Sequence, residues 1–157
     1  MKDFEYFIKN ADVKKQAVDK NLSDSLIKDS KDRLEYAKSS VLSESNAKFI
    51  YENVYEALRE AADSILVLNG FKSFSHEASI SFLQQFDEFS AVEIAEFNRM
   101  RIKRNGLKYY GKPCAVADAN EVIEFAGNLI KKFVALQRKF QKISYLLNIP
   151  PTKVGGL

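Results

Sequence analysis

The sequence predicts an all-α protein, an up-and-down bundle of about five to six helices. Glycine and proline are scarce, six and three in 157 residues, which is typical of long helices joined by short turns. Apolar residues recur every three or four positions along several long segments. A hydrophobic content of 46% is enough for a buried core. We find no internal repeat or linker, so residues 1–149 are expected to form one helical domain and residues 150–157 a loose tail.

The first two helices are predicted from apolar stripes near the N-terminus. Residues 3–19 have the helical spacing in Phe4, Phe7, Ile8, Ala11 and Val18. A second helix begins at Asn21 or Ser23, because either side chain can cap a helix. It includes Leu26, Ile27, Leu34 and Ala37. The serine-rich run at residues 39–45 is expected to end it.

The third and fourth helices are predicted on either side of a glycine turn. Residues 46–68 have the longest apolar face, formed by Ile50, Val54, Ala57, Leu58, Ala61, Ile65 and Leu68. Asn69 and Gly70 end this helix. The fourth helix begins near Ser75 and includes Ala78, Phe82, Leu83 and Phe86.

The fifth helix is predicted from a capping box. Ser90 and Glu93 have the spacing in which each side chain bonds the other residue's backbone N–H. The helix extends to about Tyr110, where Gly111 can adopt the left-handed conformation that stops a helix.

The last helix is predicted to be long. Asp118 and Glu121 repeat the capping-box spacing, and Pro150 with Pro151 ends the helix. Its buried edge is expected to comprise Val122, Phe125, Leu129, Phe133, Leu136, Phe140 and Leu147.

A local basic cluster is the most informative feature for function. Six basic residues and no acidic one lie between Arg99 and Lys112, although the net charge of the chain is only +3. On a helix, one arc of roughly a quarter turn gathers Arg101, Arg104, Asn105 and Lys108. These donors suit a phosphate-rich partner such as RNA or a nucleotide. Tyr109 and Tyr110 follow, and they either stack on a base or complete a core or dimer contact.

Arg104 borders the apolar stripe of the fifth helix, formed by Phe97, Met100 and Leu107. Removing one member of a buried ion pair costs about 3 to 5 kcal/mol, so this guanidinium needs a carboxylate, an anionic ligand or a water-filled groove. Acidic residues of the third helix are either its partners or a solvated face: Glu52, Glu56, Glu60 and Asp63. A phosphate-binding role requires the guanidinium to be open to solvent.

Two segments, YEALREAADSILVLNGFKSFSHEASISFL and FNRMRIKRNGLKYYGK, resemble the HEPN family of small helical domains, named for proposed nucleotide binding. The resemblance covers residues 46–133. It implies a HEPN-like bundle that forms a homodimer with a polar groove between the subunits. Many members are metal-independent ribonucleases, whose signature is an arginine, a polar residue after it, and a histidine five positions beyond the arginine. Others pair with a small nucleotidyltransferase in toxin–antitoxin modules, and in some a tyrosine near the motif is nucleotidylated.

The catalytic signature is incomplete in this chain. Arg104 and Asn105 match the arginine and its polar follower, but Tyr109 stands in place of the histidine. A phenol with a pKa near 10 keeps its proton at pH 7 and is a poor general base. The substitution favours binding over efficient cleavage.

His76, the sole histidine, follows the start of the fourth helix. It is either a surface or capping residue or, if folding places it opposite the basic helix, a catalytic base.

Other chemistries find no support in the sequence. One histidine and one cysteine, far apart, cannot form a zinc site, and no glycine-rich phosphate loop is present, so we expect no metal and no cofactor. Cys114 cannot form an internal disulfide, and the N-terminus has no leader pattern, so we expect a cytoplasmic protein. The apolar run at residues 65–68 is too short for a membrane span.

Three hypotheses follow. The first is a homodimeric binding module for RNA or a nucleotide, using the basic face and weakly catalytic or inactive. The second is a metal-independent endoribonuclease using Arg104 with Tyr109 or His76. The third is a structural helical dimer or adaptor in which Arg104 forms an internal ion pair.

Overall fold

The computed structural model describes residues 1–147 and confirms the all-α bundle. Two short strands accompany the helices. In chain order the elements are α1 (Phe4–Lys9), β1 (Val13–Lys15), α2 (Lys20–Ser39), α3 (Ala47–Leu68), β2 (Phe71–Ser73), α4 (His76–Ser81), the 3-10 helix η1 (Phe82–Gln85), α5 (Ala91–Tyr109) and α6 (Val116–Leu146).

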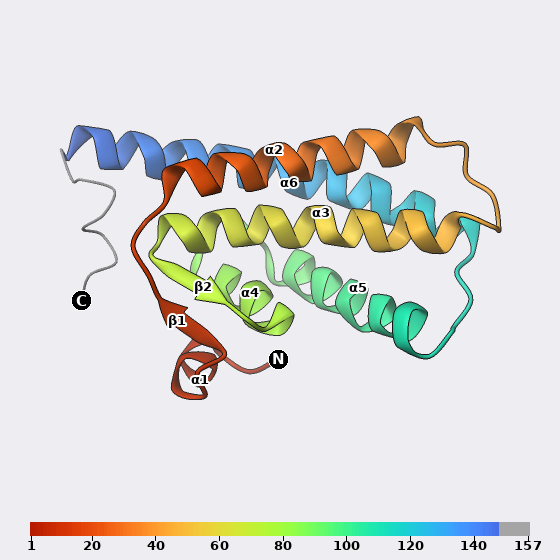
Figure 1. The fold of residues 1–157 in the computed structure, drawn as a ribbon, viewed down its shortest axis with the longest axis horizontal. Helices are drawn as coiled ribbons and strands as arrows, with labels where there is room; N and C mark the ends of the chain where they lie inside the picture. The colour runs from red at the N-terminus through yellow and green to blue at the C-terminus, as the bar shows by residue number, and fades with distance from the viewer. Residues whose placement is uncertain (148–157) are drawn as a thin grey trace.

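The helix α3 lies at the centre of the bundle. It packs against α2 and α6 on one side and against β2, α4 and α5 on the other (Figure 1). The helix α2 runs antiparallel to both α3 and α6, which run parallel to each other. The basic helix α5 is therefore separated from α2 by the thickness of α3.

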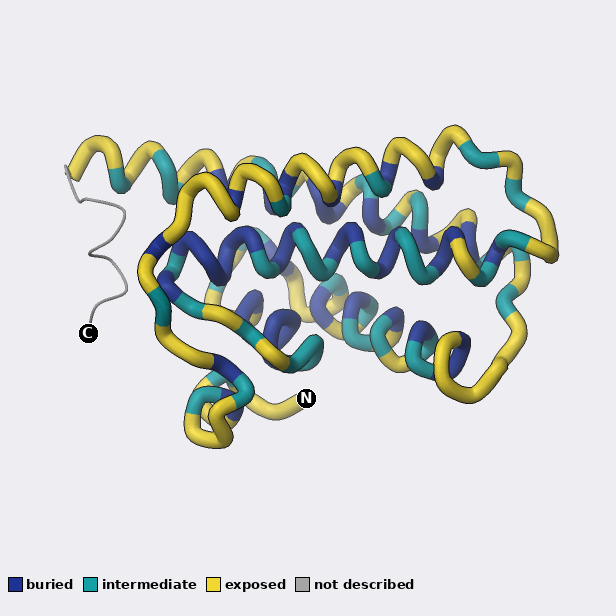
Figure 2. Tube along the Cα trace, in the orientation of Figure 1, coloured by how far each residue is buried: buried dark blue, intermediate teal, exposed yellow. Residues whose placement is uncertain are grey.

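Burial follows the same arrangement (Figure 2). Within α3, Phe49 is the one exposed residue. Large side chains that are almost completely buried come from α3, η1, α5 and α6, and they include Tyr51, Tyr55, Leu58, Phe82, Phe97 and Phe133. Fourteen of the 22 residues of α3 are buried, and so wide an apolar face must be covered by several neighbouring elements, which explains why α3 is central.

The N-terminal segment differs from the prediction. The helix predicted over residues 3–19 is wrong, because α1 ends at Lys9 after six residues and the chain passes through Ala11 with a φ of 61°. β1 then pairs antiparallel with β2, with Val13 opposite Ser73. Val13 is buried against Phe7 and Ala78. This contact with a segment distant in sequence outweighs the local helical spacing.

Two helix starts also differ. Asp19, rather than Asn21 or Ser23, caps α2 by accepting a hydrogen bond from the Leu22 backbone N–H at 2.9 Å. The helix α6 begins at Val116 instead of at Asp118. The Asp118 carboxylate accepts a hydrogen bond from the Ala115 backbone N–H at 3.0 Å, so it lies in the first turn.

Other boundaries agree with the prediction. The Ser90–Glu93 capping box is present at the start of α5. Gly70 and Gly111 both have positive φ at the ends of α3 and α5. The predicted buried edge of α6 is wrong at Leu147, which is 61% exposed. The predicted end at Pro150 and the tail at residues 150–157 lie outside the described residues.

No helix among residues 1–147 is both long enough and apolar enough to cross a bilayer.

Truncating the core of α3 should destabilise the bundle strongly. Leu58 is fully buried, and Leu58→Ala should lower the free energy of unfolding by about 2–5 kcal/mol, because a cavity is left in a packed core. Phe49→Ala in the same helix removes an exposed ring and should cost well under 1 kcal/mol, roughly the surface-substitution range. Chemical denaturation of both variants tests this. Equal losses would contradict the central position of α3.

Candidate functional site

The C-terminal end of α5 brings the basic cluster to one place. Phe97, Met100 and Leu107 anchor the helix in the core. Beyond Tyr109 the chain turns at Gly111, and the Lys112 backbone N–H donates to the Gly106 carbonyl at 3.2 Å. A Cβ on Gly106 would lie only 3.0 Å from the Lys112 side chain, so the glycine allows this close return.

Arg104 is nearly buried within one subunit, with 7% of its surface exposed. The expectation that its guanidinium lies open to solvent is therefore wrong. The guanidinium carbon lies 5.6 Å from the centre of the Tyr55 ring and 5.8 Å from that of the Tyr109 ring, which are cation–π contacts. One N–H donates to the Asn105 side chain at 3.4 Å, a long hydrogen bond. The Nε of Arg104 is buried and has no hydrogen-bond partner among the described residues.

The acidic face of α3 does not neutralise Arg104. Glu56 and Asp63 bind Arg59 of the same helix at 2.8 and 2.7 Å. Glu60 binds Arg33 of α2 at 2.9 Å. Within residues 1–147 Arg104 makes no ion pair, so the predicted carboxylate partner is absent from this part of the chain, as is the internal ion pair of the structural-adaptor hypothesis. Glu56, Glu60 and Asp63 do not form a purely solvated face either, because each of them contacts a neighbouring cation.

Three of the six cations in the cluster have carboxylate partners. Arg99 binds Glu96, Lys103 binds Asp118, and Arg101 lies 3.6 Å from Glu77. The other three make no ion pair with any described residue and gather at the end of α5: Arg104, Lys108 and Lys112. Tyr109 and Tyr110 are 63% and 78% exposed beside them. The core-completing role considered for these tyrosines is therefore wrong within the single chain.

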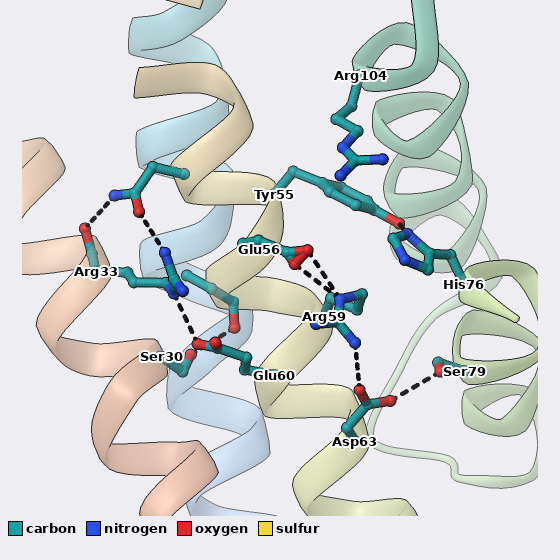
Figure 3. Close-up of polar contacts among 12 residues, drawn as sticks. Ser30, Arg33, Tyr55, Glu56, Arg59, Glu60, Asp63, His76, Ser79 and Arg104 are labelled. Carbon is teal, nitrogen blue, oxygen red and sulfur yellow. Dashed lines mark hydrogen bonds and ion pairs between the residues drawn. The ribbon is translucent and has the colours of Figure 1, made fainter. Parts of the chain in front are cut away.

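Folding brings His76 to the far edge of the ring under Arg104 (Figure 3). The His76 Nδ1 and the Tyr55 hydroxyl are 3.0 Å apart, and the two rings stack at 5.8 Å. His76 is the first residue of α4, while Ser75 performs the capping by accepting the Ala78 N–H. His76 is thus half-buried opposite α5 and is not a capping residue.

Tyr55, which connects Arg104 to His76, is a residue that the sequence interpretation missed. It lies four residues after Tyr51 and three before Leu58, so it belongs to the apolar stripe of α3. A buried tyrosine needs a partner for its hydroxyl, and this requirement was the available signal. Burial also raises the pKa of Tyr55 well above its ordinary value, which keeps the phenol protonated.

A second polar group lies below His76 in Figure 3. The Asp63 carboxylate accepts hydrogen bonds from Arg59 at 2.7 Å and from the Ser79 hydroxyl at 2.8 Å. Burial raises the pKa of Asp63 to about 6, and it outweighs the opposing effect of Arg59. The folded state therefore holds this proton more tightly than the unfolded state, and the resulting stability is lost as the pH rises from about 4 through 6.

The environment of His76 favours the neutral imidazole. Burial lowers its pKa below 6.5, and nearby guanidinium groups, first Arg59 and then Arg104 and Arg101, lower it further. A neutral imidazole at pH 7 can accept a proton. The arrangement thus combines an unpaired guanidinium, exposed cations and tyrosines, and a neutral histidine.

No group of three or more potential metal ligands occurs within residues 1–147. Cys114 is a free thiol there, and burial raises its pKa, so it is held in the unreactive protonated form.

Titration of His76 tests the electrostatics of this site. The chain has one histidine, so NMR of untagged protein should give one imidazole titration, with a pKa below 6.5. Because charging the ring in the folded state is disfavoured, this residue's contribution to stability should be lost as the pH falls below about 6.5.

Arg104→Met should raise the His76 pKa, because it removes a nearby positive charge. Arg99→Met is the matched control on the same helix, and it should leave the pKa unchanged because Arg99 is paired with Glu96. An equal response to both variants would show that Arg104 has no specific influence on His76.

No known protein-family model, curated protein or solved structure matches the chain. The inferences about function below depend on the residues around Arg104.

Proposed function

We propose that the chain is a HEPN-like cytoplasmic protein, active as a homodimer, that binds RNA or a nucleotide through phosphate contacts at the C-terminal end of α5. The residues involved are Arg101, Arg104, Asn105, Lys108, Tyr109 and Tyr110. A small nucleotidyltransferase in a toxin–antitoxin module is the proposed protein partner.

One observation supports this proposal above the others: Arg104 is a nearly buried guanidinium with a buried, unbonded Nε and no ion pair among residues 1–147. A charge in such a place is costly unless a counter-charge reaches it. Two tyrosine rings supply part of the stabilisation, roughly 0.5–2 kcal/mol each, which is less than a buried carboxylate would give. A phosphate oxygen would supply the missing acceptor.

The surroundings of Arg104 suit a phosphate that arrives from outside. The ring that covers one side of the guanidinium belongs to Tyr109, which is mostly exposed at the last residue of α5. Arg104 is only 7% exposed in this conformation, so phosphate binding requires the Tyr109 side chain to rotate and uncover the guanidinium. Lys108 and Lys112, both exposed, lie on either side of the turn and can hold neighbouring phosphates. The exposed Tyr110 offers a surface for a base.

The absence of the family histidine supports binding without efficient catalysis. Tyr109 stands five positions after Arg104, where the family signature has a histidine, and a phenol is a poorer general base than an imidazole. It can donate a hydrogen bond to a bound phosphate but is poorly suited to accept the proton of a 2′-hydroxyl.

RNA binding should depend on salt and on Arg104. Three unpaired cations predict a slope of roughly −2 when log affinity for oligouridine is plotted against log salt. Arg104→Met keeps the apolar bulk against Tyr55 and removes the charge, and it should weaken binding by roughly tenfold or more. Lys108→Ala changes an exposed side chain that is not needed for folding, and it should reduce the slope by about 0.7. Fluorescence anisotropy measures all of these.

Arg99→Met is the control with the same change on the opposite face of α5, and its affinity should match the wild type. Absence of RNA and nucleotide binding, or binding that is independent of salt, would refute the proposal. If Arg104→Met unfolds the protein but its folded fraction binds normally, Arg104 is structural.

The ribonuclease hypothesis is favoured by one observation, the placement of the half-buried His76 against Tyr55 beneath Arg104. The hydroxyl of Tyr55 lies at Nδ1, and a neutral ring leaves one nitrogen able to accept a proton. In this candidate function Arg104 neutralises the phosphate and His76 takes the 2′-hydroxyl proton.

Cleavage assays in EDTA separate the two functions. The binding proposal predicts that wild-type protein cleaves a structured RNA no faster than buffer. The ribonuclease hypothesis predicts metal-independent cleavage that falls by at least about 100-fold, the usual contribution of general acid–base catalysis, in His76→Gln. Arg99→Met should cleave like the wild type, and equal cleavage by all variants, Arg104→Met included, would identify a contaminating nuclease.

A further inference from the structure

A groove of about 390 Å³ lies between α2 and α6, on the side of α3 away from α5 (Figure 1). Its floor is apolar and is formed by Leu34, Ile130, Val134 and Ala135. Gly127 lines the groove near Lys38, and a Cβ there would make only an ordinary contact with the lysine Cε, at 3.9 Å. No acidic residue lines the groove.

Four cations border this floor, two on each helix. Lys31 and Lys38 lie on α2, and Lys131 and Arg138 lie on α6. Within each pair the residues are seven apart, which is two helical turns or about 10.5 Å. Because α2 and α6 run antiparallel, the two pairs form parallel rows along opposite edges of the groove.

The charge of these rows is not balanced by the fold. From residue 125 to its end at residue 146 the helix α6 has five basic residues and no acidic one. Lys132 and Lys139 of this set are neutralised by Glu93 and Glu88. Lys131 and Arg138, in contrast, make no ion pair with any residue of the described part, and neither does Lys31.

Lys38 has one partner, Glu35, at 3.5 Å, and both side chains are largely exposed. Such surface pairs contribute little stability, so Lys38 can exchange this partner for another at small cost. The groove thus presents four available cations.

The apolar floor between the two cationic rows favours an acidic amphipathic helix over a nucleic acid as the partner. A nucleic-acid backbone would satisfy the cations, but its phosphates and sugars would leave the floor uncovered by apolar atoms. A helix with an apolar stripe covers such a floor. Acidic residues on both flanks of that stripe, repeating every seven positions, would meet both rows, as flanking charges do in coiled coils.

We propose that the α2–α6 groove binds an acidic amphipathic helix of a partner protein, through apolar contact with the floor and ion pairs to Lys31, Lys38, Lys131 and Arg138. The partner helix lies along the groove and packs against both α2 and α6. This site is separate from the end of α5 and does not depend on the function proposed for it.

A designed peptide tests the site. It has about three heptads, with leucine at the two core positions and glutamate at both flanks. The wild-type protein should bind it in low salt, and Lys131→Glu with Arg138→Glu should weaken binding at least about tenfold, because attraction becomes repulsion at two places. The same double variant should instead gain affinity for the matching peptide with lysine flanks.

The control is Lys9→Glu with Lys72→Glu, which gives the same net charge. Both residues are exposed, on α1 and β2, on the other side of α3 from the groove. This control should bind the acidic peptide within about twofold of the wild type, a difference well under 1 kcal/mol. Circular dichroism confirms that each variant is folded.

Two outcomes would overturn the inference. If the groove variant and the control variant weakened peptide binding equally, the weakening would come from the change in net charge and not from the groove. Binding of polyglutamate or polyuridine as tight as that of the amphipathic peptide, and equally sensitive to the groove variant, would show that the apolar floor has no part and that the surface recognises polyanions.

Discussion

The near-complete burial of α3 is the constraint on which the rest of this fold depends. Most polar side chains of α3 have little contact with water, so their hydrogen-bonding groups need partners within the protein. Arg33 of α2 meets Asn53 and Glu60, and Ser79 of α4 meets Asp63. The Ser30 hydroxyl donates to the Ala57 carbonyl at 2.6 Å, which brings α2 into close contact with α3. These bonds fix how the outer helices lie on the central one.

Tyr55 extends this principle to the candidate site. Its hydroxyl must be satisfied, and His76 does so at 3.0 Å. Its ring face must also be covered, and the guanidinium of Arg104 does this from α5. The packing of Tyr55 thus holds a cation over the face of its ring and an imidazole at its hydroxyl edge. Within residues 1–147 the same packing leaves Arg104 without a carboxylate, since Glu56, Glu60 and Asp63 of α3 pair with Arg59 or Arg33.

The helical bundle could be predicted from the sequence because its signals are local. The apolar stripe of α3, the Ser90–Glu93 box and the glycines after α3 and α5 each act within a few residues. The strand at Val13 could not be predicted, because its stability comes from β2, which is distant in the chain. For Arg104 the sequence predicted only that a charged side chain borders an apolar stripe. The groups that contact this guanidinium depend on the tertiary placement of Tyr55 and Tyr109, which spacing along one helix does not reveal.

The β1–β2 pairing has a consequence for the order in which the chain assembles. Val13 meets Ser73 only across the whole of α2 and α3, so the entropy of closing that long loop must be offset before the two short strands gain anything from pairing. The contact between α2 and α3 is much more local, because only residues 40–46 separate the two helices. Contact order therefore favours formation of the α2–α3 hairpin before the strand pairing, and this hairpin would shorten the effective loop. On this basis we expect the N-terminal strand to pair late.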